Sequence, residues 1–194
     1  TLHFAGRRSG AFVPVNCAAL APELLAAELF GHVKGSSEGA VSDRPGLLHQ
    51  AHLGTLLLDE VDAIPLSEQA KLVRALVDGE VLRVGATRAE HVDVRVIATT
   101  SAPLQRLVDE GTFDPALLAV ISEVSLSVPS LRERPGDVVH LAQRFLEILA
   151  PEREELAFSP AAAAAMERYT WPGNVRELMS CVERAVALST GSTL

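Results

Sequence analysis

The chain has 194 residues, of which 48% are hydrophobic and 22% are charged, and its net charge is −8. This size allows one sizeable core and a small satellite domain. The negative charge and the lack of a Lys/Arg cluster argue against direct DNA binding by this segment. No apolar run of about 18 residues and no secretory signal is visible, so we expect a cytoplasmic protein with no membrane partner.

The first part of the chain alternates between strand-like and helix-like segments. Short apolar runs predict core strands at residues 12–16, 56–58, 94–99 and 124–128. Apolar residues at helical spacing predict helices over residues 22–30 and 67–78, the second with Leu72, Val73, Leu76 and Val77 facing inward. A hairpin is expected from Glu80 onward, running into the strand at 94–99. This order predicts an α/β layered domain with a mostly parallel sheet.

A long polar loop separates the first helix from the second strand. Residues 31–46 contain four Gly and three Ser and show no apolar periodicity. Such a segment is typical of an exposed loop that carries function.

From residue 135 onward the pattern indicates helices alone. They are expected over residues 136–149, from Ser159-Pro160, and over residues 175–188. Ser159 is a favourable helix cap, and Asn174 followed by Glu177 resembles a capping pair. We therefore expect an α/β domain over residues 1–134 and a helical domain over residues 135–194.

Seven short motifs occur along the chain. They are VNCAAL (15–20), ELFGHVKG (28–35), GTLLLDE (54–60), LRVGATR (82–88), VDVRVIATT (92–100), LRERPGD (131–137) and WPGNVREL (171–178). In order and spacing they resemble the central AAA+ ATPase domain of bacterial enhancer-binding proteins, which activate RNA polymerase carrying sigma-54. The resemblance covers nearly the whole chain. It implies a P-loop AAA+ three-layer fold with a mostly parallel sheet and a small helical lid.

The resemblance also implies cofactors and partners. ATP and Mg²⁺ are the expected cofactors, and the subunits are expected to form a hexamer-like ring that remodels a closed promoter complex. DNA would be contacted only through domains outside this chain.

Two adjacent carboxylates, Asp59 and Glu60, follow the strand at 56–58 and match the family's Walker B positions. The resemblance implies that Asp59 holds Mg²⁺ through water and that Glu60 polarises the attacking water. The alternative is that these acids merely end a strand at the surface.

Two further residues match functional positions of the family. Asn16 matches the switch residue whose amide holds the catalytic carboxylate away from water, and the alternative is an Asn that caps its own turn. Arg176 matches the second-sensor arginine of the lid, which reaches the γ-phosphate. Its alternative is a solvated helix-face Arg, paired with Glu177 or Glu183.

The phosphate-binding GxxxxGK loop is absent from the chain, and by the motif spacing it belongs several residues before Thr1. The strand that precedes this loop lies in the middle of the family's sheet. Without it, we expect either two core strand edges that lack partners or a rearrangement of the sheet. Excerpting from a longer protein is the favoured explanation over natural loss.

Three motifs depart from the family inside the match. The sigma-54-contacting GAFTGA loop is replaced by Gly35, Ser36, Ser37, Glu38, Gly39 and Ala40. The loss of its aromatic and Thr residues puts productive contact with sigma-54 RNA polymerase in doubt. The two arginine fingers of the FREDLYYRLN segment are replaced by Asp114 and Val120, and the first-sensor Asn of ATN by Ser101.

These features leave three hypotheses. The first is an ATP-driven remodelling enzyme. The second is a degenerate, non-hydrolysing nucleotide-binding or oligomerisation scaffold within a transcription regulator. The third is a heteromeric ring partner whose nucleotide site is completed by another subunit's arginines. We expect an AAA+ domain of the sigma-54-dependent type with weak or absent ATPase activity.

Overall fold

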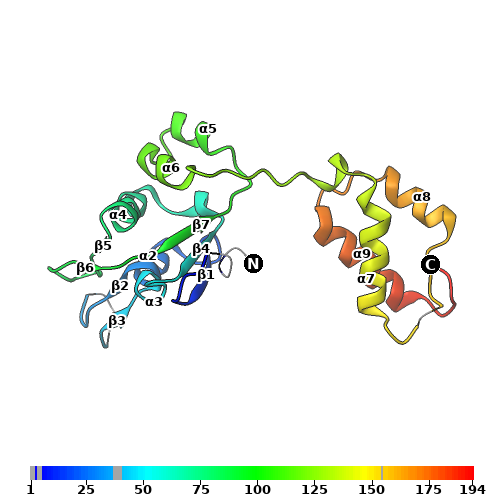
Figure 1. Cartoon of the computed structure of the whole chain (residues 1–194), viewed down its shortest axis with the longest axis horizontal. Coiled ribbons are helices and arrows are strands. Elements are labelled where there is room, and N and C mark those ends of the chain that lie inside the picture. The colour runs from blue at the N-terminus through cyan, green and yellow to red at the C-terminus, as the bar shows by residue number, and fades with distance from the viewer. Residues whose placement is uncertain (1–2, 4–5, 37–40, 154) are drawn as a thin grey trace. The chain divides into compact units, whose positions relative to one another are not determined.

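The computed structural model describes residues 3, 6–36, 41–153 and 155–194. The chain forms two compact units that divide between Ser125 and Leu126 (Figure 1). This division lies before the expected boundary at residue 134, because Leu131 is buried in the core of the second unit. Among the described residues, no helix is long and apolar enough to cross a membrane.

A three-stranded parallel sheet forms the centre of the first unit. Its strands are β1 (Phe12–Asn16), β4 (Thr55–Asp59) and β7 (Arg95–Ala98), in the spatial order β1-β4-β7. The register places Asn16 opposite Asp59. These strands confirm the predictions at residues 12–16, 56–58 and 94–99. Because the strands are parallel, their carboxyl ends meet at one edge of the sheet.

Helices surround this sheet in the first unit. They are α2 (Pro22–Phe30), α3 (Leu47–Gln50), the 3₁₀ turn η1 (Val61–Ala63), α4 (Leu66–Val77), α5 (Leu104–Asp109) and α6 (Pro115–Ile121). Leu29 of α2, Leu56 of β4, Leu72 of α4 and Leu117 of α6 are fully buried in one core. This apolar burial is the main source of stability for the unit.

The helix predicted over residues 67–78 is α4, with one of its inward positions wrong. Leu72 is fully buried, and Val73 and Leu76 pack partly against the core. Val77 is 62% exposed instead. Val77 follows Leu72 by five residues, which places it roughly 140° away from Leu72 around the helix axis. Gln69 is buried on the inward face of the helix instead.

Two short antiparallel strand pairs bring two loops together. β2 (Gly31–His32) pairs with β3 (Arg44–Pro45), and β5 (Glu80–Val81) pairs with β6 (Glu90–His91), which confirms the predicted hairpin. Val33 donates its backbone N–H to the carbonyl of Val84 at 3.1 Å. A Cβ on Gly85 would meet Cβ of Ser36 at 2.6 Å, so the first part of the polar loop lies directly against the hairpin loop.

The fourth predicted strand, at residues 124–128, is wrong. This segment is irregular, and Val124, Leu126 and Val128 are 78%, 77% and 82% exposed. Alternating apolar residues form a strand only where a neighbouring strand completes the hydrogen-bond ladder. In the described part of the chain, β7 pairs with β4 alone, so the segment has no strand beside it.

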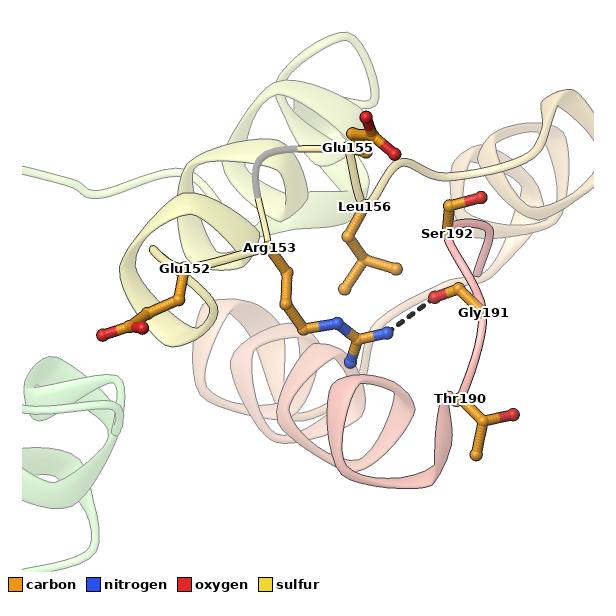
Figure 2. A pocket seen from close by; sticks show the side chains of 7 residues that line it. All are labelled: Glu152, Arg153, Glu155, Leu156, Thr190, Gly191 and Ser192. Carbon is orange, nitrogen blue, oxygen red and sulfur yellow. Dashed lines mark hydrogen bonds between the residues drawn. The ribbon is translucent and has the colours of Figure 1, made fainter.

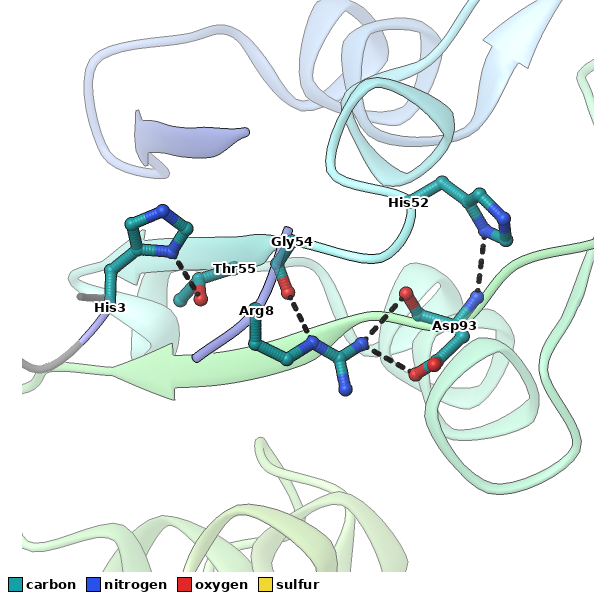
Figure 3. Close-up of polar contacts among 6 residues, drawn as sticks. All are labelled: His3, Arg8, His52, Gly54, Thr55 and Asp93. Carbon is teal, nitrogen blue, oxygen red and sulfur yellow. Dashed lines mark hydrogen bonds and ion pairs between the residues drawn. The ribbon is translucent and has the colours of Figure 1, made fainter. Parts of the chain in front are cut away.

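His3 and Arg8, which precede β1, make polar contacts near the amino ends of β4 and β7 (Figure 3). Arg8 donates from Nε to the carbonyl of Gly54 at 3.1 Å, and from a terminal nitrogen to Oδ1 of Asp93 at 2.5 Å. This guanidinium lowers the pKa of the Asp93 carboxyl through its hydrogen bond and charge. Nδ1 of His52 accepts from the backbone N–H of Asp93, and Nδ1 of His3 lies 2.9 Å from the Thr55 hydroxyl.

The second unit is helical, as predicted. It contains the 3₁₀ turn η2 (Leu131–Glu133), α7 (Asp137–Leu149), α8 (Pro160–Arg168) and α9 (Asn174–Leu188). Val138, Leu146, Leu178 and Val182 form its core with Trp171. The Ser159 hydroxyl accepts from the N–H of Ala162 at 3.1 Å, which confirms the predicted cap of α8.

The capping pair expected at the start of α9 is wrong in one member. Glu177 does accept a backbone N–H, but from Gly173 at 2.8 Å, and Gly173 is the cap residue. The Asn174 side chain accepts instead from the N–H of Leu131 at 2.8 Å. Asn174 therefore ties α9 to η2 and does not cap its own helix.

Arg153 organises the end of the second unit (Figure 2). Its guanidinium donates to the carbonyl of Gly191 at 2.6 Å, to the carbonyl of Val186 at 3.3 Å and to the hydroxyl of Ser189 at 3.2 Å. The surrounding shallow pocket is lined mainly by polar residues, including Glu152, Thr190 and Ser192. The Arg153 guanidinium already donates to two carbonyls and a hydroxyl of the chain. We therefore interpret its role in this pocket as structural.

Candidate functional site

The candidate site lies where the carboxyl ends of the three parallel strands meet. Asn16 ends β1, Asp59 ends β4, and Thr99 follows β7. Glu60 comes next to Asp59 and adopts a left-handed backbone, with φ 57° and ψ 56°. Such a conformation is uncommon for a residue other than glycine and is often found at functional sites. The turn leaves Glu60 exposed at the sheet edge.

Asp59 is held from both neighbouring strands. The Thr99 hydroxyl donates to Oδ1 at 2.5 Å, and the side-chain amide of Asn16 donates to Oδ2 at 3.2 Å. A carboxylate has about four lone-pair sites, so each oxygen keeps the capacity for one further contact. The arrangement therefore fixes the orientation of Asp59 and leaves it able to bind a ligand.

Asn16 has a second set of contacts. Its side-chain oxygen accepts from the N–H groups of Ala18 and Ala19, both at 2.9 Å. The resemblance implied contact with Glu60, whereas the structure places the amide against Asp59. The Asn16 side chain therefore does two things at once. Its oxygen caps its own turn, as the alternative proposed, and its amide nitrogen donates to a carboxylate.

The sheet edge is strongly acidic. Burial raises the pKa of the Cys17 thiol from 9.0 to about 12, with further contributions from the charges of Asp59, Asp62 and Glu60. The Thr100 hydroxyl donates to Oδ1 of Asp62 at 2.5 Å. A thiol buried beneath three carboxylates stays protonated, and the same charges attract a cation to the edge.

The donor set fits Mg²⁺ bound together with a phosphate group. In the described part of the chain, no cluster of three or more His, Cys, Asp or Glu side chains could hold a metal. Mg²⁺ is commonly held by one or two carboxylates, with water and substrate phosphates as its other ligands. Asp59 and Glu60 supply carboxylates of this kind, and the phosphate ligands would come with the nucleotide.

Arg176 lies in the second unit, near the start of α9, and is exposed. Within that unit's described residues its side chain makes no hydrogen bond or ion pair. The alternative pairing with Glu177 is not observed, because the Glu177 carboxylate accepts from Tyr169 and from Gly173. The guanidinium is therefore available to a ligand.

The two positions expected to have lost arginine fingers lie at opposite ends of α6. Asp114 caps the helix by accepting from the N–H of Ala116 at 2.7 Å. Its own N–H donates to Oε1 of the buried Gln69 at 2.7 Å. Val120 is half-buried and lines a hollow beside Val94 and Val96 of the β7 segment. Asp114 thus has a structural role as the cap of α6, whereas Val120 only borders this hollow.

The partner loop is described only in part. Gly35 has φ 79° and Ser36 packs against Gly85. Lys34 donates its backbone N–H to Oδ1 of Asp43 at 2.8 Å, which joins the two sides of the loop. Ser37, Glu38, Gly39 and Ala40 lie outside the described residues.

Sequence reasoning missed Thr99, Thr100 and Asp62 at this edge. The available signal was the run of hydroxyl residues that follows the strand predicted at 94–99. Polar residues at the end of one parallel strand lie near those at the end of the next, provided that the two strands are neighbours.

The comparisons with known proteins identify the family. Residues 1–127 match the family model described as the Sigma-54 interaction domain, and residues 132–194 match the AAA+ ATPase lid domain. The chain therefore belongs to the sigma-54 interaction domain family of AAA+ proteins. This finding confirms the resemblance and the expected α/β fold with a helical lid.

Its relatives include proteins that are named as regulators. The chain is 44% identical over 193 residues to the regulatory protein AtoC of Escherichia coli (strain K12), covering 98% of this chain and 42% of AtoC. It is 48% identical over 187 residues to the nitric oxide reductase transcription regulator NorR1 of Cupriavidus necator, covering 95% of this chain and 36% of NorR1. The chain thus spans less than half of either relative's length.

A solved structure of NtrX from Brucella abortus in complex with ATP is also similar. The TM-score is 0.84 at 38% sequence identity, and the match covers 94% of this chain and 40% of that one. The same fold in NtrX accompanies a bound nucleotide.

Proposed function

We propose that this chain is the nucleotide-binding AAA+ segment of a sigma-54-type transcription regulator, with weak or absent ATP hydrolysis. The observation that carries the proposal is the acidic edge, where Asp59 and Glu60 follow β4 and Asp59 is held by Asn16 and Thr99. A strand-end Asp that holds Mg²⁺ is one of the recurring parts of P-loop nucleotide sites, which supports this proposal.

Each residue at the edge has a chemical role. Mg²⁺, when bound with ATP, neutralises charge on the phosphates. Asp59 would hold the cation through water, using the carboxylate lone pairs that Asn16 and Thr99 leave free. Glu60, exposed in its left-handed turn, would orient an attacking water and accept its proton. Arg176 lies in the helical unit and not at this edge, and by its match to the family's second-sensor arginine it would donate to the γ-phosphate.

Slow hydrolysis follows from what replaces the arginine fingers. Asp114 is negatively charged and Val120 is uncharged, so neither supplies a positive charge to a neighbouring subunit. An arginine finger accelerates phosphoryl transfer by about 10³ to 10⁵. We therefore propose that the nucleotide is bound much better than it is turned over.

The proposed partners follow the family. Subunits associate into a ring, and DNA is bound by domains outside this chain. Ser37 and Glu38 replace the aromatic and Thr of the family's loop. We therefore propose that contact with sigma-54 RNA polymerase is weak.

The test is ATP binding and steady-state turnover by the full-length protein, together with Glu60→Gln. Glu167→Gln is the matched control, because Glu167 is an exposed α8 residue far along the chain from the acidic edge. Binding with slow turnover that is abolished by Glu60→Gln alone supports the proposal. Absence of nucleotide binding overturns it, and turnover typical of an active remodeller overturns the proposed weakness.

A scaffold without hydrolysis is the second candidate, favoured by the structural role of Asp114 on α6. Binding with no turnover at any protein concentration would support it. Turnover that appears only on mixing with a relative that retains its arginines would instead support the heteromeric ring, in which that relative completes the site.

A further inference from the structure

Thr99 connects β7 to both carboxylate residues. Its hydroxyl donates to Oδ1 of Asp59 at 2.5 Å, and the same oxygen accepts from the backbone N–H of Glu60 at 3.3 Å. Its backbone N–H donates to the carbonyl of Leu58 at 2.9 Å, and its carbonyl accepts from Val61 at 3.0 Å. One residue thus contacts the chain on both sides of the acidic pair.

Ser101, at the position of the family's first-sensor Asn, makes no such contact. Its side chain is exposed and has no hydrogen bond to any residue that the structure describes. Thr100 is directed to Asp62 instead. Among the hydroxyl residues after β7, Thr99 is therefore the one that reaches the acidic pair.

We propose that Thr99 is a positioning residue that orients Asp59 for a hydrated cation and stabilises the left-handed turn at Glu60. The inference rests on the proposed nucleotide function and adds a residue to it. A hydroxyl donating to a carboxylate forms a short, charge-assisted bond, which restricts rotation of the Asp59 side chain. Asn16 donates to the other oxygen, so the carboxylate is held from both neighbouring strands.

The Glu60 contact explains the second half of the role. A left-handed backbone is energetically unfavourable for a residue other than glycine, because its Cβ crowds the neighbouring carbonyl oxygen. By accepting the Glu60 N–H, the Thr99 oxygen helps to offset that cost. Removing the hydroxyl therefore frees both the Asp59 carboxylate and the Glu60 turn.

The test compares Thr99→Val, which keeps the shape and loses the hydroxyl, with Thr99→Ser, which keeps the hydroxyl. Thr112→Val is the matched control, because the Thr112 hydroxyl donates to the Leu107 carbonyl and has no hydrogen bond to Asp59 or Glu60. Thr99→Ala is the substitute if the valine variant fails to fold. All are made in the full-length protein.

The first readout is the Mg²⁺ concentration that gives half of the metal-dependent gain in affinity for a fluorescent ATP analogue. Loss of a residue that orients a metal ligand weakens metal binding by about 10-fold to 100-fold. We expect a shift of about tenfold in Thr99→Val, with nucleotide binding in EDTA unchanged. Thr99→Ser and Thr112→Val should keep the wild-type value. An unshifted Mg²⁺ midpoint in Thr99→Val overturns the role toward the cation.

The second readout is amide hydrogen exchange at Glu60, which needs no nucleotide. Faster exchange in Thr99→Val, with Thr99→Ser at the wild-type rate, is expected. If the wild-type protein binds no nucleotide, the proposed function fails and exchange alone decides the positioning role. Unchanged exchange then overturns it.

Discussion

Asn16 donates its side-chain amide to Oδ2 of Asp59 at 3.2 Å while its side-chain oxygen caps the turn at Ala18 and Ala19. The residue therefore joins the end of β1 to the end of β4. These two functions can be separated, because aspartate keeps the capping oxygen and loses the amide donor.

Asn16→Asp should destabilise the protein at neutral pH by about 1 to 2 kcal/mol, since it replaces a hydrogen bond by a close pair of like charges. Uptake of a proton by one of the two carboxylates relieves this repulsion in the folded state. The loss should therefore shrink as the pH falls and the folded protein takes up a proton. Denaturant unfolding at pH 7.5 and pH 5 measures the difference.

Asn16→Ala provides the control for this pH dependence. It removes both sets of contacts and introduces no charge. Its destabilisation should therefore be similar at the two pH values, and a parallel pH response in both variants would contradict the charge argument.

Asp114 contributes to stability as the cap of α6. Asp114→Ala should cost about 1 kcal/mol, because the N–H of Ala116 loses its acceptor, whereas Asp114→Asn should cost only a few tenths. Thermal or denaturant unfolding of the two variants measures the difference. Equal losses in both would show that the charge, and not the cap, is what matters at this position.

Much of this fold follows from local pattern. The apolar runs at residues 12–16 and 94–99 predicted β1 and β7. Two acids after a buried strand also fit a plain strand end at the surface, so local pattern alone did not assign Asp59 and Glu60 a function, and their proposed roles come from the resemblance to the family.

The remaining features depend on contacts across the chain. That Thr99, and not Ser101, reaches Asp59 depends on β7 lying directly beside β4, which alternation along one strand does not show. The segment at 124–128 has the same alternation as a real strand but no partner in the described residues. Asn174 has a capping sequence, yet Leu131 from a distant turn takes its side-chain oxygen.

His49 makes the first unit sensitive to acid. Its Nε2 lies 3.1 Å from Oε2 of Glu90, which also pairs with Arg83 of the same hairpin. Burial lowers the pKa of His49 below 6.5, although the Glu90 charge acts in the opposite direction. The unfolded chain therefore binds a proton at a higher pH than the folded one, so stability is present above pH 6.5 and is lost as the pH falls through the folded pKa.

His49→Gln should flatten the fall in unfolding free energy below pH 6.5. Denaturant unfolding at several pH values between neutral and moderately acidic checks this, with His140→Gln, on the exposed face of α7, as the control. If His49→Gln keeps the wild-type acid dependence, another group is responsible.

Cys17 should have the opposite effect in alkali. Its side chain is 1% exposed, and burial followed by the Asp59 charge raises its pKa from 9.0 to about 12. Between these values the folded protein keeps a proton that the unfolded chain releases. The stability linked to this thiol is complete below pH 9.0 and is lost as the pH rises toward 12, by at most about 1.4 kcal/mol per pH unit.

Cys17→Ala should therefore remove part of the alkaline loss of stability. The difference in unfolding free energy between wild type and variant is expected to be constant from pH 7 to 9 and to shrink from pH 9 to 11, measured by denaturant unfolding. In the same folded protein, an alkylating reagent at pH 8 should label the half-buried Cys181 and leave Cys17 unmodified until the chain unfolds. Parallel stability curves, or labelling of Cys17 in the folded state, would show that the acidic edge does not enclose a protonated thiol.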